Sequence, residues 1–266
     1  YVKFLKKYKP KMFVFENVPG ILSAKNGEFL EKIKEAIDEA GYIVEHKTLT
    51  SKDFGVLQNR RRVILIGWKK NKKLKYPVFD KFPIQGEIMK DLFYDLPKLE
   101  PGEEKAPATY TKSINEYLKL SKIRNGIDFT TQHVARNNNE RDLEIYRTAI
   151  DLWVNKGRRL NYADLPSELK THKNETAFLN RFQVVDPKGV CHTVVAHISA
   201  DGHYYIYPDL KQVRSISVRE AARIQSFPDD FFFEGGRTAA FKQIGNAVPP
   251  LMAEGIANKI KEMICL

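Results

Sequence analysis

The fold is decided by the stretch Met12-Phe13-Val14-Phe15-Glu16-Asn17-Val18-Pro19-Gly20. Its apolar half, residues 12–15, predicts a short strand buried in a sheet, and the Pro-Gly pair indicates the turn that follows. Glu16 and Asn17 therefore come where the strand ends. Since ligands of open α/β sheets bind at the carboxyl ends of strands, this polar pair is a candidate binding site.

The next segments predict a helix and two further strands. Apolar residues recur at helical spacing in residues 27–40, and Gly41 stands where a helix commonly ends. Residues 42–49 and 63–68 indicate strands, and the continuous apolar run in the second is typical of a strand buried on both faces. The order strand, helix, strand, strand indicates an α/β sheet, and for the chain as a whole we expect an α/β fold with a parallel-rich sheet.

A second, irregular lobe is expected in residues 77–214, whose first part is interrupted by prolines. Within it we expect short helices at residues 113–121 and 139–156, and β-type stretches at 182–185, 192–198 and 204–207. Beyond this lobe, Ser217 and Glu220 have the spacing of a capping box at the start of a helix. Apolar residues then repeat at helical spacing through a closing helix that reaches Ile264.

The charge balance favours a polyanionic partner. Lys and Arg number 44 against 33 Asp and Glu, which leaves a formal charge of +11. Such an excess suits phosphate neutralisation, although many basic proteins bind no nucleic acid.

The two cysteines, Cys191 and Cys265, have no paired spacing, so we expect neither a disulfide framework nor a zinc site, and a reducing cytoplasm fits best. His192, His197 and His203 share no helical face, and no metal is expected. No apolar run approaches the length of a membrane span.

Two motifs carry possible chemistry, each with a plainer alternative. The carboxyl of Glu16 and the carboxamide of Asn17 suit the donor and acceptor edge of a planar heterocycle, or they simply end a strand. In the run from Gln58 to Arg62, Arg60 and Arg62 fall on one side of an extended segment. Two guanidiniums there suit a phosphate or a base carbonyl, or they belong to a solvated basic turn.

Further motifs follow near the end of the chain, and the complete set resembles the ordered blocks of the DNA (cytosine-5) methyltransferases. The blocks are Glu-Asn-Val from Glu16, Gln-x-Arg-x-Arg from Gln58, a long irregular insert, Arg-Glu-x-x-Arg-x-Gln-x-Phe-Pro from Arg219, and Gly-Asn-x-Val-Pro-Pro from Gly245. Any one block is modest support, whereas all of them in this order are highly specific. They cover nearly the whole chain.

The resemblance implies a Rossmann-like sheet of the S-adenosylmethionine-dependent methyltransferases, built from residues 1–76 and 215–266. Residues 77–214 would form the irregular, mixed target-recognition lobe. The implied activity is transfer of a methyl group from S-adenosylmethionine to C5 of a flipped cytosine in a specific sequence of double-stranded DNA. The implied setting is bacterial restriction–modification in the cytoplasm.

Residue roles carry over motif by motif. Glu16 would protonate or hydrogen-bond cytosine N3, which eases thiolate addition at C6. Asn17 would orient the catalytic loop, Arg60 would hold the cytosine O2, and Arg62 would support the site. Gln58 would be structural.

Other roles concern the methyl donor and the DNA. Asn246 and Val248 would lie beside S-adenosylmethionine. Thr193 and Val194 match the short element near which the family contacts DNA. Phosphate or base contacts are also expected from further basic residues: Arg136, Arg181, His133, Lys173 and His203. The charged and polar residues of the late helix would organise the lobes: Arg219, Glu220, Arg223 and Gln225.

The chain departs from the family pattern at its start. The glycine-rich donor loop and the Pro-Cys nucleophile motif precede Glu-Asn-Val in the family, and only fifteen residues lie before Glu16 here. Neither Cys191 nor Cys265 takes the nucleophile's place. We therefore expect a sheet incomplete on its N-terminal side, an incomplete donor pocket and a chain inactive alone. It would need a missing N-terminal segment or a complementary subunit, or associate with itself.

Two rival functions stay open. The chain is also compatible with a non-catalytic DNA-recognition subunit or a remnant of a split methyltransferase. A role in the family's branch that acts on transfer RNA is less well supported, because the insert of well over a hundred residues is larger than that role requires.

Overall fold

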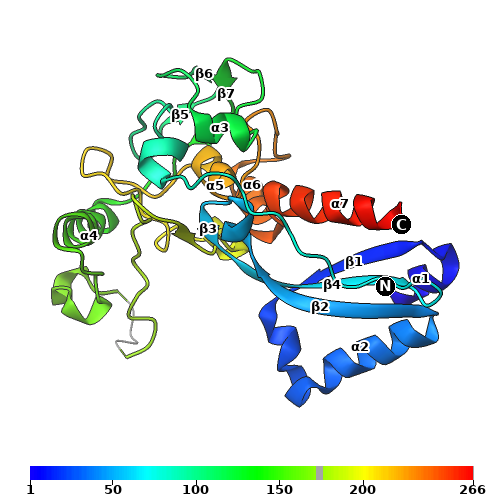
Figure 1. Ribbon diagram of the computed structural model, residues 1–266. Helices are drawn as coiled ribbons and strands as arrows, with labels where there is room; N and C mark the ends of the chain where they lie inside the picture. Colours follow the sequence, from blue (N-terminus) through cyan, green and yellow to red (C-terminus); the bar gives the residue numbers. More distant parts are fainter. Residues whose placement is uncertain (172–175, 266) are drawn as a thin grey trace. The chain divides into compact units, whose positions relative to one another are not determined.

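The computed structural model describes residues 1–171 and 176–265, which divide into two compact units (Figure 1). The first unit contains residues 1–54, 60–82 and 251–265, and the second contains residues 55–59 and the described part of 83–250. Residues 215–250 thus pack within the second unit, whereas the boundaries expected from the sequence group them with residues 1–76.

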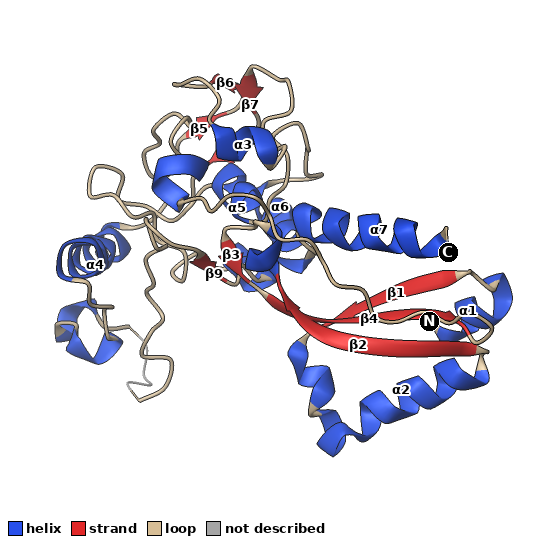
Figure 2. Cartoon of the chain, viewed as in Figure 1, coloured by secondary structure: helices blue, strands red, loops and turns tan. Residues whose placement is uncertain are grey.

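The first unit is built on a sheet of three strands (Figure 2). The strand order is β1 (Met12–Asn17), β4 (Arg61–Lys69), β2 (Tyr42–Thr50), and both pairings are antiparallel. The expectation of a parallel-rich sheet is therefore wrong for these strands. The short connection from β2 to β4 returns the chain antiparallel, because a parallel neighbour needs a crossover of roughly a dozen residues.

Helices cover both faces of this sheet. α2 (Glu28–Glu39) contributes Leu30 to a cluster with Val63 and Leu65 of β4. On the other face, Ile64 and Ile66 pack with residues of α7 (Pro250–Ile264). Alternate side chains of β4 thus enter two different cores, which confirms a strand buried on both faces.

Sequence signals at the ends of these elements are also confirmed. Gly41 follows α2 with a φ of 88°, the left-handed backbone that a glycine adopts without strain. The strand β1 includes Glu16 and Asn17 as its last two residues. One helix, α1 (Val2–Tyr8), was not expected; its Leu5 packs with Phe13 of β1.

The second unit contains little regular sheet. Its strands pair in twos: β3 (Gln58–Asn59) with β9 (Cys191–His192), β5 (Glu104–Lys105) with β8 (His133–Val134), and β6 (Ala108–Thr109) with β7 (Phe129–Thr130). Its helices are α3 (Glu116–Leu120), α4 (Glu140–Ile150), α5 (Val218–Ile224) and α6 (Arg237–Asn246).

The β-type stretches expected late in this unit form only isolated bridges and one short strand. Ile206 bridges to Val184 and to Ser215, and Ala196–Ser199 is a 3-10 turn. Side chains take up backbone groups that a strand would have paired: the Tyr205 hydroxyl donates to the Thr193 carbonyl at 2.9 Å. Alternating apolar residues were therefore a poor guide to extended pairing here.

Charged side chains make up much of the core around α5. The capping box of Ser217 and Glu220 is present as expected, and every residue of the helix is buried. Arg223 donates from Nη1 to Asp95 and from Nη2 to Asp229, both at 2.6 Å. Glu220 is held by Arg214 through two bonds of 2.7 and 2.8 Å. Because buried charges are tolerated only when paired, α5 orders the segments that carry its partners.

Replacing Arg223 with Ala should lower the free energy of unfolding by about 3–5 kcal/mol, since Asp95 and Asp229 would remain buried without their cation. Urea denaturation followed by circular dichroism measures this. Arg147→Ala, an exposed arginine on α4, is the matched control. A loss for Arg223→Ala no greater than that of the control would contradict the role given to this cluster.

Candidate functional site

The C-terminal end of β1 holds an ion pair between two of the expected site residues. The Nε of Arg62 on β4 lies 2.6 Å from Oε1 of Glu16, whose side chain is 31% exposed, against 11% for Arg62. Arg62 also donates to the carbonyl of Arg61 at 2.8 Å. Glu16 is thus oriented by a nearly buried guanidinium while part of its carboxylate stays accessible to a ligand.

Asn17 and Arg60 complete the set of expected catalytic residues in the first unit. The side-chain oxygen of Asn17 accepts from the Val18 amide at 2.8 Å, which fixes the turn after β1. Arg60 is buried. Its amide donates to the Ser51 hydroxyl at 3.2 Å, and its carbonyl accepts from the Ser51 amide at 2.9 Å.

Burial alternates from Asn59 to Arg62, so that Arg60 and Arg62 point inward while Arg61 is exposed. This alternation agrees with the placement of both arginines on one side of an extended segment, and it argues against a solvated basic turn. Ser51, the residue that ties the loop before Arg60 to the end of β2, carried no signal in the sequence. Its role follows only from the folded chain, in which Ser51 lies beside Arg60.

Gln58 joins three sequence motifs inside the second unit. Its Nε2 donates to Oε1 of Gln225 at 2.9 Å, and its Oε1 accepts from the Val194 amide at 2.9 Å. Thr193 donates from its hydroxyl to the Asn59 carbonyl at 2.8 Å. The structural roles expected of Gln58 and Gln225 agree with these bonds.

Thr193 and Val194 differ in what they can offer to DNA. The Val194 side chain is fully buried, so direct contact of this side chain with DNA is not favoured, and its role in the structure is to anchor the element. Thr193 is partly exposed, and its contact with DNA stays a prediction.

The basic residues expected to touch DNA are largely committed to their own chain. Arg136 donates to the carbonyls of Ile198 and Ala200 at 2.9 and 3.1 Å. Arg181 is buried, donates to the Ala177 carbonyl at 2.6 Å and lies over the Tyr162 ring at 3.8 Å. Phosphate or base contacts by these two guanidiniums stay a prediction. Within the chain the guanidiniums hold turn carbonyls, whose neighbours in space the sequence does not reveal.

The two described histidines of that group also have internal partners. His133 is buried between the Ser217 hydroxyl at 2.9 Å and the Pro97 carbonyl at 2.8 Å. His203 contacts the Tyr146 hydroxyl at 2.8 Å. A DNA contact by buried His133 is therefore not favoured. Lys173 lies outside the described residues.

The expected donor-binding residues lie at the end of α6. Asn246, its last residue, is exposed, and Val248 is half-buried. Gln225, the residue after α5, donates to the Ile244 carbonyl at 2.6 Å and thereby holds this helix end. Gly245 is required there, because an added Cβ would lie 2.3 Å from the backbone of Val195.

The thiol of the buried cysteine is expected to be unreactive. Cys191 is completely buried in β9, and burial raises the pKa of its thiol far above the usual range. A thiol that stays protonated is a poor nucleophile. This agrees with leaving Cys191 out of the catalytic residues.

Comparison with known proteins gives the same picture as the motifs. A family model described as C-5 cytosine-specific DNA methylase matches residues 1–262. The type II methyltransferase M.Bpa9945I of Bacillus paralicheniformis is 46% identical over 99% of this chain and 63% of its own length. For M.XorII, a type II methyltransferase of Xanthomonas oryzae pv. oryzae, the values are 30%, 99% and 61%. The chain therefore spans somewhat under two thirds of these relatives.

Solved structures support the fold. A chain described as a DNA modification methyltransferase encoded within a prophage (E. coli) superposes with a TM-score of 0.71 at 24% identity, covering 100% of this chain and 73% of that one. The methyltransferase EhMeth of Entamoeba histolytica gives a TM-score of 0.52 at 14% identity, with coverages of 99% and 68%. At these identities the likeness concerns the α/β methyltransferase fold. In the described part of the chain, no helix is both long and apolar enough to cross a bilayer.

Arg62→Gln should lower the free energy of unfolding by about 1 kcal/mol, because a partly buried pair loses its cation. The neighbouring substitution Arg61→Gln removes an exposed guanidinium and should change stability by less than about 0.5 kcal/mol. Chemical denaturation compares the two variants. Equal effects would show that Arg62 does not hold Glu16.

His133 should make stability depend on pH. Burial lowers the pKa of His133 from 6.5 to about 4, so the unfolded state binds more protons in this window and stability falls as the pH drops through it. Since Pro97 offers only an acceptor, the neutral ring donates from Nε2. His133→Gln should remove about 3 kcal/mol of the change in unfolding free energy between the two ends of the window. An unchanged pH slope in denaturation experiments would contradict this.

Proposed function

The chain belongs to the family of C-5 cytosine-specific DNA methylases, and from this premise we propose the activity of the protein that contains it. The protein transfers a methyl group from S-adenosylmethionine to C5 of a cytosine extruded from a specific sequence in double-stranded DNA. The type II names of the relatives support a setting in bacterial restriction–modification, hence in the cytoplasm.

The pair of Glu16 and Arg62 carries the proposal. Cytosine C5 is a weak nucleophile until a thiolate adds at C6, and a hydrogen bond or proton at N3 lowers the barrier to that addition. Glu16 suits this task, because Arg62 fixes one side of its carboxylate at 2.6 Å and leaves the rest accessible. Arg62 is thus a positioning residue, and Glu16 is the group that touches the base.

Arg60 and Asn17 support the same site. Arg60 lies two residues before Arg62 and shares its inward side, so we assign it to the O2 of the extruded cytosine. Asn17 holds the turn that leaves β1 through its bond to the Val18 amide, and we assign it to the orientation of the neighbouring loop. The thiolate is assigned to a segment of the protein outside this chain, since the Cys191 thiol is buried and protonated and Cys265, which follows α7, belongs to none of the motif blocks.

The residues at the end of α6 have side chains of the chemical types that the methyl donor requires. Asn246 offers an exposed carboxamide and Val248 a partly exposed apolar side chain, which match the polar and apolar parts of S-adenosylmethionine. S-adenosylmethionine supplies the electrophilic methyl group when bound. Gln225 and Gly245 keep these two residues in place by holding α6 against the turn Ala196–Ser199.

Glu16→Ala should reduce methyl transfer by at least about a hundredfold, the usual size of a general acid–base contribution. The measurement is incorporation of tritiated methyl groups into unmethylated duplex DNA by the full-length protein. Glu35→Ala, an exposed glutamate on α2, is the matched control and should retain activity.

Full activity of Glu16→Ala would exclude the role assigned to this carboxylate. Duplex binding without methyl transfer by the wild-type protein would instead favour a recognition subunit. Methylation of transfer RNA in place of duplex DNA would overturn the substrate class.

A further inference from the structure

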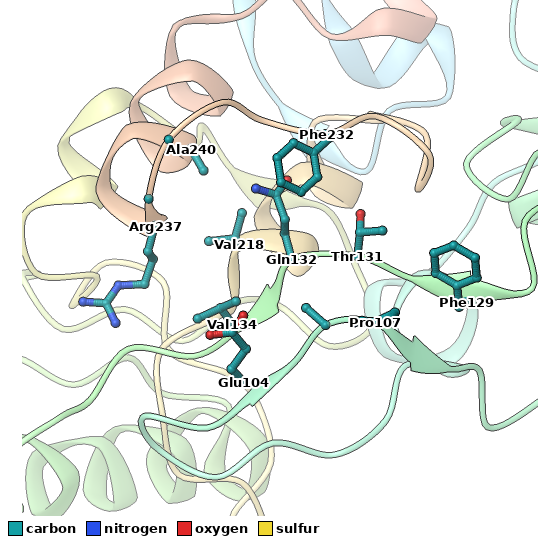
Figure 3. A pocket seen from close by; sticks show the side chains of 13 residues that line it. Glu104, Pro107, Phe129, Thr131, Gln132, Val134, Val218, Phe232, Arg237 and Ala240 are labelled. Atoms are coloured by element: carbon teal, nitrogen blue, oxygen red, sulfur yellow. The ribbon is translucent and has the colours of Figure 1, made fainter.

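A pocket in the second unit is lined by none of the residues assigned above (Figure 3). Its volume is about 560 Å³, within the range of roughly 300–1,000 Å³ in which small ligands bind. Phe129, Pro107 and Phe232 contribute to its apolar wall, and Glu104 and Arg237 are its charged residues. Figure 3 shows Arg237 and Phe129 at opposite ends of the pocket.

The aromatic wall is exposed but rests on a fixed support. Phe232 is 60% exposed and Phe129 is 44% exposed. Next to Phe232, the backbone of Phe233 is held by Gln132 through two hydrogen bonds of 2.8 and 2.9 Å. Exposed rings on a fixed backbone lose little conformational freedom when a planar group stacks on them.

The opposite end of the pocket favours an anion. Arg237 is the first residue of α6, and the N-cap Gly236 makes no side-chain capping bond. Burial lowers the pKa of the Arg136 guanidinium, and the positive charge of nearby Arg237 lowers it further. The buried Nε atoms of both arginines have no hydrogen-bond partner. Their Nη atoms donate to main-chain carbonyls, Arg237 to Ala135 at 3.4 Å and Arg136 to Ile198 and Ala200 at 2.9 and 3.1 Å, and carbonyls do not neutralise the charge. Two guanidiniums that are hydrogen-bonded to carbonyls, next to the first turn of a helix, favour an anion.

We propose that this pocket binds a nucleotide, with the base against Phe129 and Phe232 and the phosphate at Arg237 and the start of α6. Glu104 then accepts a hydrogen bond from an exocyclic amino group of the base, as carboxylates do with cytosine N4. Thymine has no such group and binds less well. The nucleotide would be an unpaired nucleotide of the DNA that the protein acts on, and in this respect the inference rests on the proposed function.

The proposal is tested by fluorescence anisotropy with three labelled probes: a matched duplex, the same duplex with one unpaired cytosine, and the same duplex with one unpaired thymine. Deoxycytidine monophosphate serves as an unlabelled competitor. The wild-type chain should prefer the unpaired cytosine. Phe232→Ala should weaken binding of that probe about tenfold, as expected for loss of one stacked base.

Arg237→Gln should weaken binding by a similar factor. It should also reduce the slope of the logarithm of the binding constant against the logarithm of salt concentration by about one. Glu104→Gln should remove the preference for cytosine over thymine. The matched controls are Phe178→Ala, an aromatic residue 74% exposed in the same unit, and Arg147→Gln, an exposed arginine on α4. Both controls should bind like the wild type, and thermal unfolding checks that all variants fold.

Wild-type affinity of Phe232→Ala and Arg237→Gln for the unpaired-cytosine probe would overturn this inference and leave the proposed methyl transfer untouched. Absence of DNA binding by the wild-type protein would overturn both. Displacement of the unpaired-cytosine probe by the monophosphate, lost in Phe232→Ala, would support the nucleotide chemistry of the pocket. Binding of the monophosphate together with equal affinity for the matched and unpaired-cytosine duplexes would assign the pocket to free nucleotides and overturn DNA as the source.

Discussion

The second unit depends on charges buried around a single short helix. α5 places Arg223 between Asp95 and Asp229 and Glu220 against Arg214, all of them buried. Removing such groups from water is costly, and the cost is offset only when every partner is in place. In a unit whose strands pair only over two residues, this requirement orders loops that sheet hydrogen bonds do not reach.

The first unit is held together by regular secondary structure and apolar cores. Its three strands and the flanking helices α2 and α7 form two apolar cores, and the backbone pairing of β1 with β4 brings Glu16 close to Arg62. Sites supported by strands are held more precisely than sites on loops. The chemistry assigned to Glu16 thus lies on a rigid element, whereas recognition is assigned to loops whose side chains vary more freely.

Much of the fold followed from local pattern. The helical spacing before Gly41, the apolar run of β4 and the capping box of α5 all predicted elements that the structure contains. Errors came where the outcome depended on distant partners. Strand direction depended on which strand lay between β1 and β2, and the late apolar stretches stayed irregular because side chains took their backbone bonds. Arg136, Arg181 and His133 carry charge or hydrogen-bonding groups in the sequence, yet the structure commits them to internal carbonyls.

The sequence by itself determined the order of the motif blocks, and hence the family, together with the periodic helices and strands, because periodicity and capping act over a few neighbouring residues. Tertiary structure decided which polar side chains are buried, which are paired and which line a pocket. Arg223 meets Asp95 across 128 positions, and Gln58 meets Gln225 across 167. Since partners so far apart are chosen by how the chain packs, only the folded chain separates the arginines that stabilise it from those, such as Arg237, that face a pocket.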